Sequence, residues 1–528
     1  MVKRVHVVSV IAALLISSVA AADKLEVADL PSPPLEVIKN PAQVELPALP
    51  AFDLPVTDAG FHSPRQLRVR GKAALGTEVK VRGYITWVYD CAAQLASINT
   101  EATRAQILLS IDSDPALCEP PKFYLGDRKD TSQDASIWVV EVPRAPTKSE
   151  RQRLPKEERK ALSAAPKIAT GDYVTVTGTW AQHSPHNEHN LDGLLIFKSL
   201  AATTPGLHAG ATAPAVFARD PEIAVATKAP PAKDVDPEIR NASVDHLNAC
   251  NKAIVAKHYD VALKECELAT KAWAGNHLAW FALGSAYIAR TEWSPARTAA
   301  EQAVVLRPDQ PMYQLYYGIA LYEAEVQRAR EDQARRENKK PDEITLDPTA
   351  LKLDQARDAL VRATRLAPAL WRGHYYLGRV YRDLDDPRRA AEQLLQTIAM
   401  HPTYRYSYIA LIQLYRRWDY LDQALAVASL GTGRVATAES GELWFELGMA
   451  YGARRADVKA IEAFGTAIAI RPDDMDAKFQ RGQIFARRGE LAAAKRDLEE
   501  VGRSTDPKLV AAKQVANQLL AEMAARKH

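Results

Sequence analysis

The second half of this 528-residue chain repeats one pattern about every 34 residues. The clearest copy begins at His277 and reads HLAWFALGSAYIARTEWSPARTAAEQAVVLRPD. Each copy has room for two helices, and a late proline ends the second one. A single helix hairpin cannot bury its own apolar face, so neighbouring copies must stack. The repeat therefore predicts an all-helical solenoid with a concave surface.

The recurring residues of this copy keep a fixed spacing. They are Trp280, Leu283, Gly284, Tyr287, Ala296, Ala303 and Pro308. This set resembles the tetratricopeptide repeat pattern. The same frame gives seven copies over 243–508, and the polar-faced helical stretch 509–528 suits a capping helix. The third copy carries an insertion near 325–352, whose charged start predicts an extended helix and a protruding loop.

The resemblance implies that the first helix of each hairpin lines a groove that binds a protein or peptide. The matching groove positions here are Tyr322, Arg372, Tyr375, Arg379, Arg382, Tyr406, Gln413 and Arg416. Arginine grips carboxylates with two hydrogen bonds, and tyrosine supplies stacking area. The set predicts a partner with an acidic segment or a C-terminal carboxylate. The alternative is that these arginines are ordinary solvated helix side chains.

The region 64–201 has the alternation of apolar and polar residues that is typical of strands. The predicted strands are GTEVKVRGYITWVYDC, RAQILLSIDS, KFYLGD, ASIWVVEVP, DYVTVTGTWAQ and DGLLIFKSL, with the charged helical segment TKSERQRLPKEERKALSAAP before the last two. With one strand more before the helix, this order resembles the three strands, helix and two further strands of an oligonucleotide/oligosaccharide-binding (OB) fold. The predicted fold class is therefore multidomain, an all-β OB-like barrel followed by an all-α tetratricopeptide repeat solenoid.

The stretch AQHSPHNEHNLDG, between the last two predicted strands, holds His183, His186 and His189. OB folds use this loop for ligands, so the histidines are a candidate ligand loop. Three histidines could also hold a zinc ion, but Pro185 excludes the regular helix that would put them on one face. A plain hairpin loop is the favoured interpretation. No cofactor or metal is predicted.

The barrel could instead be a ligand-binding module. Trp87, Tyr89, Tyr124 and Trp138 are aromatic residues that could stack on bases. The basic run 144–160 is interrupted by acidic residues, as in a solvated helix. The net charge of only +3 does not favour binding to nucleic acid. Nucleic acid is thus not the expected partner. The alternative function is a barrel that binds oligosaccharide, nucleic acid or metal while the repeats recruit a partner.

The start of the chain, MVKRVHVVSVIAALLISSVAAADKL, is typical of a secretory signal peptide over 1–22. Its apolar run is short for a membrane span, so no membrane span is expected after cleavage. Proline-rich segments follow at 23–63, predicted as a disordered leader, and at 202–242, predicted as a flexible linker. The expected location is the bacterial periplasm or the cell exterior.

The cysteine content fits export. The four cysteines are Cys91, Cys118, Cys250 and Cys266. Three connectivities are possible, but Cys250 and Cys266 fall about equally far from the turn of the first helix hairpin, which favours a bridge between them. Cys91 and Cys118 would then form the second bridge. Buried free thiols are the alternative.

Motifs that mark catalysis are missing from the sequence. It has no G-x-S-x-G, no phosphate-binding glycine loop, no H-E-x-x-H and no G-x-G-x-x-G before a helix. We therefore expect an exported, non-enzymatic adaptor or scaffold that binds a partner protein or peptide through the repeat groove.

Overall fold

The computed structural model describes residues 34–98, 102–158, 165–186, 188–205, 211–217, 221–228, 235–344, 346, 348–506 and 509–525. Internal contacts divide the chain into two compact units. The first comprises Met1–Leu46 with Phe217–Ser407, and the second comprises Pro47–Val216 with Tyr408–His528. The division therefore falls inside the helical part, within helix α14 (Arg405–Arg417), and not at the boundary between strands and helices. No helix among the described residues is long and apolar enough to cross a membrane.

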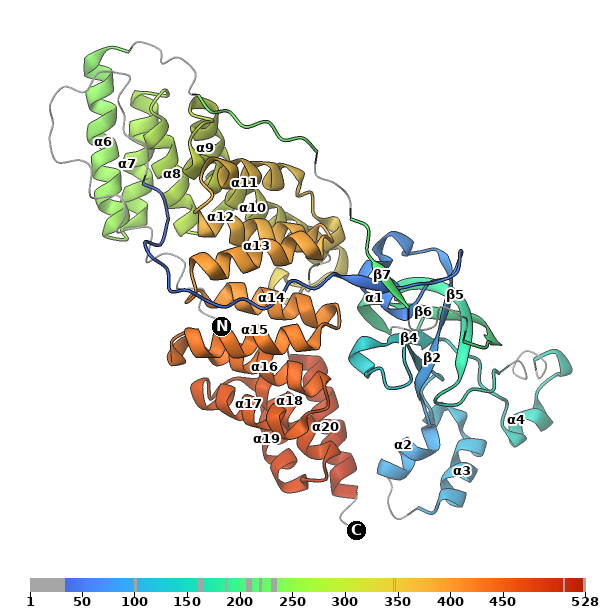
Figure 1. The fold of residues 1–528 in the computed structure, drawn as a ribbon. Helices are drawn as coiled ribbons and strands as arrows, with labels where there is room; N and C mark the ends of the chain where they lie inside the picture. Colours follow the sequence, from blue (N-terminus) through green and yellow to red (C-terminus); the bar gives the residue numbers. More distant parts are fainter. Residues whose placement is uncertain are drawn as a thin grey trace. The chain divides into compact units, whose positions relative to one another are not determined.

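Five strands of the second unit form a closed barrel (Figure 1). They are β2 (Glu78–Val88), β3 (Phe123–Gly126), β4 (Ile137–Val140), β5 (Tyr173–His183) and β6 (His189–Ala202). Around the barrel the order is β2-β3-β4-β6-β5, and all pairs are antiparallel except β4 with β6. Alternate residues such as Val81, Ile85 and Val176 are fully buried, which is the strand periodicity that the sequence displays.

One predicted strand is wrong, because RAQILLSIDS forms helix α3 (Arg104–Ser113). The Thr103 side chain caps this helix by accepting a hydrogen bond from the backbone N–H of Gln106, and the Gln106 side chain returns a bond to Thr103. Of the apolar run that suggested a strand, Ile107 is buried, whereas Leu108 and Leu109 are exposed. Helices α2 (Cys91–Ile98) and α3 lie between β2 and β3, and α4 (Lys148–Arg153) lies between β4 and β5.

The proline-rich leader is not disordered over its described residues. Phe52 is fully buried and contacts the rings of Tyr415, Trp418 and Tyr420 at centroid distances of 6.2, 5.3 and 5.5 Å. Next to it, strand β1 (Asp53–Pro55) pairs with β7 (Thr212–Pro214), which lies in the predicted linker. The sequence prediction missed this because composition does not register one large aromatic side chain that finds a buried site.

The linker is also held in the first unit. Ile223 is buried, and its carbonyl oxygen accepts a hydrogen bond of 2.8 Å from Nη1 of Arg365. The description of 202–242 as a flexible linker is therefore wrong for this part. Helix α6 begins at Pro237, six residues before the predicted start of the repeats at 243.

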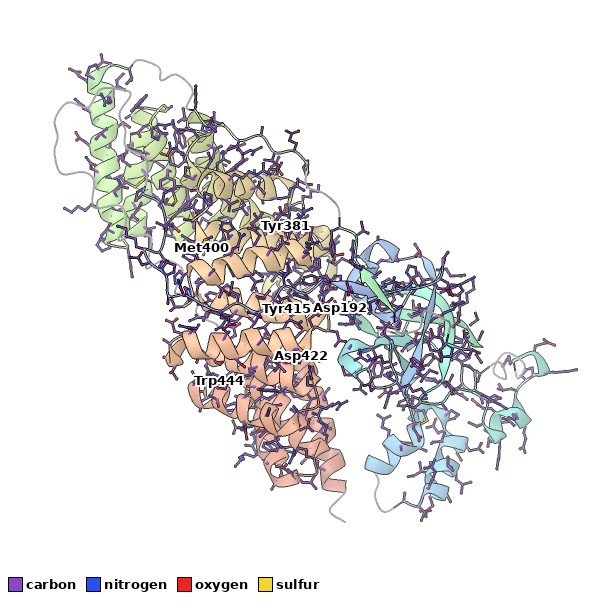
Figure 2. The ribbon with its side chains drawn as sticks, in the orientation of Figure 1. Asp192, Tyr381, Met400, Tyr415, Asp422 and Trp444 are labelled. Carbon is purple, nitrogen blue, oxygen red and sulfur yellow. A yellow bond between two sulfur atoms is a disulfide. The ribbon has the colours of Figure 1, made fainter. Side chains whose placement is uncertain are left out.

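Within the second unit, the barrel is attached to the end of α14. Nη1 of Arg68, on helix α1 (Pro64–Arg70), donates to the Arg417 carbonyl at 2.8 Å, and Arg65 donates to the Trp418 carbonyl. Arg417 forms an ion pair of 3.0 Å with Asp192 of β6. Figure 2 labels Asp192 on the barrel and Tyr415 on α14. These contacts connect the barrel with the last repeats.

The helices follow one another in antiparallel pairs (Figure 1). In the first unit they are α6 (Pro237–Val255), α7 (Tyr259–Ala272), α8 (His277–Ala289), α9 (Trp293–Leu306), α10 (Pro311–Glu337), α11 (Asp354–Leu366), α12 (Trp371–Asp383) and α13 (Pro387–Met400). In the second unit α14 is followed by α15 (Leu421–Arg434), α16 (Gly441–Ala453), α17 (Asp457–Ile470), α18 (Met475–Arg487), α19 (Leu491–Arg503) and α20 (Val510–Ala525).

Small residues allow the two helices of a pair to approach closely. A Cβ atom on Gly448 of α16 would lie 2.7 Å from the ring of Phe464 on α17, which is closer than such atoms pack. The glycine of the repeat pattern is therefore a packing requirement. The predicted extended helix of the insertion is confirmed, since α10 runs for 27 residues and ends at Asn338 in a left-handed conformation.

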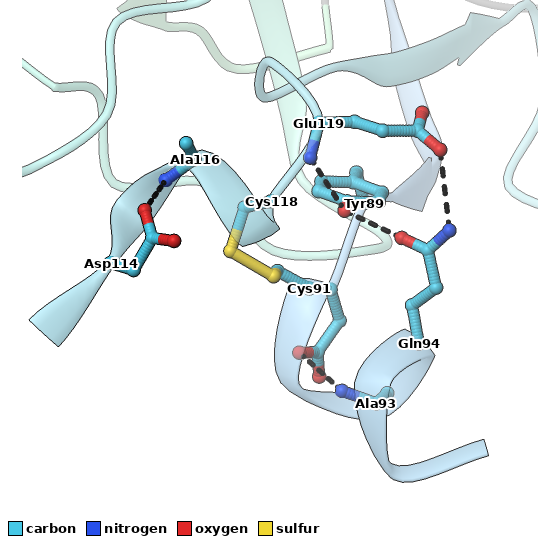
Figure 3. Close-up of a disulfide and its surroundings, with 9 residues drawn as sticks. Tyr89, Cys91, Ala93, Gln94, Asp114, Ala116, Cys118 and Glu119 are labelled. Atoms are coloured by element: carbon cyan, nitrogen blue, oxygen red, sulfur yellow. Dashed lines mark hydrogen bonds between the residues drawn. A yellow bond between two sulfur atoms is a disulfide. The ribbon is translucent and has the colours of Figure 1, made fainter. Parts of the chain in front are cut away.

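Both expected cysteine pairs are within bonding distance. Cys91 pairs with Cys118, and Cys250 of α6 pairs with Cys266 of α7. Around the first pair, Tyr89 donates to Gln94 and accepts from the backbone N–H of Glu119, so a small polar network closes over the bridge (Figure 3). Cys250 and Cys266 are fully buried between their helices.

Candidate functional site

A buried carboxylate from the leader lies against the first helices of two neighbouring pairs in the first unit. Glu36 is only 6% exposed. Its Oε1 and Oε2 accept hydrogen bonds of 3.0 and 2.9 Å from Nη1 of Arg372, and Oε1 accepts one of 2.8 Å from the Tyr316 hydroxyl. Arg372 lies in the first turn of α12 and Tyr316 in the second turn of α10, two helices in contact. We call these three residues the carboxylate site.

The charges of the carboxylate site support each other. Burial disfavours the charge of Arg372, but the Glu36 carboxylate and nearby tyrosines more than offset this, so the pKa of Arg372 lies above its ordinary value. Burial, assisted by the Glu36 charge, raises the pKa of the Tyr316 hydroxyl, which therefore stays protonated and donates. The site is thus a preformed receptor for one carboxylate.

Next to it is a cluster of tyrosines around Arg379. The guanidinium of Arg379 lies 4.6 Å from the ring centroid of Tyr322 and 5.2 Å from that of Tyr376, and its Nη1 donates to Glu323 at 2.7 Å. The Tyr322 hydroxyl donates to Asp383 at 2.7 Å. The aromatic and cationic character predicted from the sequence is present, but acidic residues of the same chain neutralise it.

The predicted groove residues divide between the two units. Arg372, Tyr375, Arg379 and Arg382 share α12, and Tyr322 lies on α10. The ring of Tyr404 contacts both Tyr375, at 5.0 Å, and Tyr406, at 5.5 Å, which brings Tyr406 to the same cluster. Gln413 and Arg416 belong to the second unit, where both donate to Glu446 of α16, at 2.6 and 2.7 Å.

The sequence prediction missed Glu36, Tyr316, Glu323 and Glu446. Glu36 was missed because the proline-rich segment was treated as unfolded. The sequence PLEVI did contain a signal, namely a single acidic residue between apolar residues. The other acidic residues lie on the helices that were searched for cations. Searching the same faces for acidic partners would have found them.

The histidine loop is the hairpin between β5 and β6. Nδ1 of His186 lies 2.7 Å from a carboxylate oxygen of Glu141, and its backbone N–H donates to the other oxygen. His183 ends β5, and the side chain of His189 is outside the described residues. No group of three metal-ligating side chains occurs in the part of the chain that the structure describes. Glu188, in the same loop, pairs with Lys122 at 3.1 Å.

The barrel aromatics form a row on its outside. Trp87 contacts Tyr124 at 5.1 Å, and Tyr124 contacts Trp138 at 5.8 Å between ring centroids. All three are half-buried, whereas the barrel interior is filled by the alternate residues, such as Phe123 and Leu125. These three aromatic side chains therefore do not fill the barrel.

Comparison with known proteins finds matches for the helical part. No curated protein matches the chain. Among solved structures, MamA has 19% identity, a TM-score of 0.30 and coverage of 37% of this chain and 92% of its own. YrrB, described as a TPR protein with an unusual peptide-binding site, has 17% identity, a TM-score of 0.30 and coverage of 40% and 95%. Pseudomonas aeruginosa pilF has 13% identity, a TM-score of 0.35 and coverage of 47% and 99%.

A family model for the tetratricopeptide repeat matches residues 459–503. This stretch spans most of α17, all of α18 and all of α19, which have the helix lengths and the glycine and alanine positions of the other pairs. The helical part of this chain is therefore an all-helical solenoid similar to those of tetratricopeptide repeat proteins, and residues 459–503 match the family model itself.

Proposed function

We propose that this protein is an exported, non-enzymatic adaptor whose first-unit repeats bind an extended acidic segment of a partner protein. Tetratricopeptide repeat proteins are in general protein-interaction adaptors, and this supports the adaptor class for the present chain. Export is supported by the signal-like start of the chain and by the two cysteine pairs, which suit an oxidising compartment such as the periplasm.

The observation that carries the proposal is the binding of Glu36 by Arg372 and Tyr316. The segment that presents Glu36 has no helix or strand from Pro34 to Phe52, so the repeats receive an extended chain. Hydrogen bonds from a guanidinium and a hydroxyl to one carboxylate give the contact both strength and direction. A partner segment with the same chemistry would occupy the same residues by displacing the leader.

Displacement of the leader is feasible because few of its side chains are buried between Glu36 and Phe52. Residues 38–43 are exposed, and only Glu36 in the first unit and Pro50 and Phe52 in the second are buried. An intramolecular segment competes at an effective concentration in the millimolar range. A partner segment must therefore bind the carboxylate site more tightly than the leader does, or bind it while the leader is detached. The leader would then set a threshold for partner binding.

Capture from a cell-envelope extract tests this proposal. The mature protein, residues 23–528, is compared with Glu36→Gln, which weakens the leader, and Arg372→Gln, which removes the receptor. A partner should be enriched by the first variant, lost with the second, and displaced by excess synthetic peptide PLEVIKNPAQVEL. Glu45→Gln is the matched control, because Glu45 is an exposed carboxylate of the same segment. A catch that does not depend on Arg372 would contradict the proposal.

A second function is supported by the row of barrel aromatics. We propose that the barrel is OB-like, because its strands follow the order first, second, third, fifth, fourth around the closed sheet. The row Trp87, Tyr124 and Trp138 spans its first three strands and would stack on a sugar or base. Loss of oligosaccharide binding in Trp87→Ala, with binding retained in Trp293→Ala of helix α9, would support this function. Equal binding by both variants would reject it.

A further inference from the structure

The second unit contains a cavity of about 370 Å³ that neither function uses. Its walls come from α1, β2, the loop after β3, and the start of β5. We call it the arginine cavity and define it by Arg65, Arg68, Arg82, Tyr84 and Tyr173. Its volume is within the range of small-molecule sites.

The arginine cavity is rich in cations. Five basic side chains line it: Arg65, Arg68, Arg82, Arg128 and Lys129. The acidic side chains among its lining residues are Asp58, Asp127 and Asp419. Asp58 is exposed and pairs with Arg82, and burial raises the pKa of Asp127 to about 6, against the opposing charges of Arg65 and Arg68. The acids therefore offset the basic residues only in part.

Three of these arginines have unsatisfied donors. The buried Nε atoms of Arg65, Arg68 and Arg82 have no hydrogen-bond partner among the described residues. A buried donor without an acceptor costs about 1–3 kcal/mol, so three on the residues that line one cavity are an exception. Burial lowers the pKa of Arg68, in contrast to Arg372, whose pKa is raised beside Glu36. Among the described residues, Asp419, Asp192 and Asp127 act on Arg68 only through their charge, and none is hydrogen-bonded to it as Glu36 is to Arg372.

The cavity also has an aromatic wall, made by two tyrosine rings inclined at 58° to each other. The rings of Tyr84 and Tyr173 lie 4.8 Å apart, and Nζ of Lys129 lies 5.8 Å from the Tyr84 ring centroid. Hydroxyl groups complete the lining, from Thr57, Ser63, Thr131 and Thr212. A ring with hydroxyl groups fits such a wall, because tyrosine faces pack on C–H surfaces while the hydroxyls exchange hydrogen bonds.

We propose that the arginine cavity binds a small ring-bearing organic anion of the size of a sugar phosphate. The guanidinium groups would hold the oxyanion, since their fork matches phosphate oxygens, and the tyrosine pair would pack on the ring. The site is separate from the carboxylate site, which belongs to the other unit, and it uses none of the residues of the outer aromatic row. It would make the barrel a sensor or carrier of an anionic metabolite.

Isothermal titration of the mature protein, residues 23–528, tests the proposal with glucose 6-phosphate, glucose and sodium sulfate. We expect glucose 6-phosphate to bind most tightly, sulfate more weakly, and glucose not at all. Arg82→Gln should weaken glucose 6-phosphate at least tenfold. Asp58→Asn should strengthen it several-fold, because it removes the acid that competes for Arg82. Arg104→Gln, an exposed arginine on α3 outside the lining, is the control and should change nothing.

Arg82→Gln is expected to lower the affinity for glucose 6-phosphate and Asp58→Asn to raise it. This difference distinguishes an effect on binding from an effect on folding, because a misfolded barrel would lower the affinity in both variants. Equal affinity for glucose 6-phosphate and glucose would overturn the oxyanion role, and equal affinity for sulfate and glucose 6-phosphate would overturn the ring role. No heat with any of the three compounds, or weaker binding in Asp58→Asn, would overturn the proposal as a whole.

Discussion

At the scale of single residues, two buried arginines show how the surroundings decide the role of a charge. Arg372 is 6% exposed and has a carboxylate and a hydroxyl as partners, whereas Arg68 is 8% exposed and its Nη1 has only a backbone carbonyl. Arg372 thus forms an ion pair with Glu36, whereas the hydrogen bond of Arg68 is to an uncharged carbonyl group. The repeat pattern could identify Arg372 as a candidate groove residue. It could not show that Arg372 pairs with Glu36, because the two residues are 336 positions apart in the sequence.

The leader should open when Arg372 is replaced. In Arg372→Gln the Glu36 carboxylate loses its ionic partner, and breaking one side of a buried pair costs about 3 kcal/mol. Trypsin cleavage after the exposed Lys39 should then accelerate by one to two orders of magnitude, because it follows the population of the open segment. Mass spectrometry of the fragments measures this rate. Arg388→Gln, an exposed arginine on α13 paired with Glu392, is the control, and an unchanged rate at Lys39 would show that Arg372 does not hold the leader.

His277 should make the stability pH-dependent. Burial lowers its pKa from 6.5 to about 4, and its Nδ1 lies 2.5 Å from the Tyr313 hydroxyl. Since the folded-state pKa is below the unfolded one, the stabilisation is present above pH 6.5 and is lost as pH falls toward 4. The free energy of unfolding should decrease by about 2 kcal/mol more between pH 7.5 and 4.5 in the wild type than in His277→Gln, measured by urea unfolding. Parallel pH profiles would rule out this role.

At the scale of elements, the repeat helices and the barrel helix α4 were predictable, whereas the barrel helices α2 and α3 were not. The glycine, alanine and proline positions of each copy determine where two helices cross and where the second ends, so the pairs α8–α9 and α12–α13 follow from the pattern. RAQILLSIDS has strand-like composition, yet Thr103 and Gln106 cap it as a helix. The capping interaction favours the helix, and the apolar run misled because only Ile107 of its three large apolar residues is buried.

The bridge between α6 and α7 should stabilise the first pair locally. Cys250 and Cys266 are 16 residues apart, and the loop-entropy model gives about 3 kcal/mol for a loop of this size. In Cys250→Ala/Cys266→Ala, hydrogen exchange in α6 should speed up by about two orders of magnitude, while α16 is unaffected. Cys91→Ala/Cys118→Ala is the matched control. Equal exchange of α6 in both double variants would mean that packing alone holds the pair.

At the scale of the whole molecule, sequence reasoning identified the two kinds of structure but not which parts associate. The second unit combines the barrel with the last repeats, and the first combines the leader up to Leu46 and the linker from Phe217 with the other repeats, so both units combine segments distant in sequence. Single contacts such as Phe52 with Trp418 and Ile223 with Arg365 make these associations. They depend on complementary surfaces that only the folded chain presents, which is why periodicity and composition did not reveal them.

The central claim is that the first-unit repeats recognise a carboxylate on an extended segment. Its most direct test is fluorescence anisotropy with labelled PLEVIKNPAQVEL and the same peptide carrying Glu36→Gln, titrated with Glu36→Gln protein, whose own leader competes poorly. We predict that the glutamate peptide binds at least tenfold more tightly than the glutamine peptide, and that Arg372→Gln in the protein abolishes the difference. Equal binding of the two peptides would contradict the account.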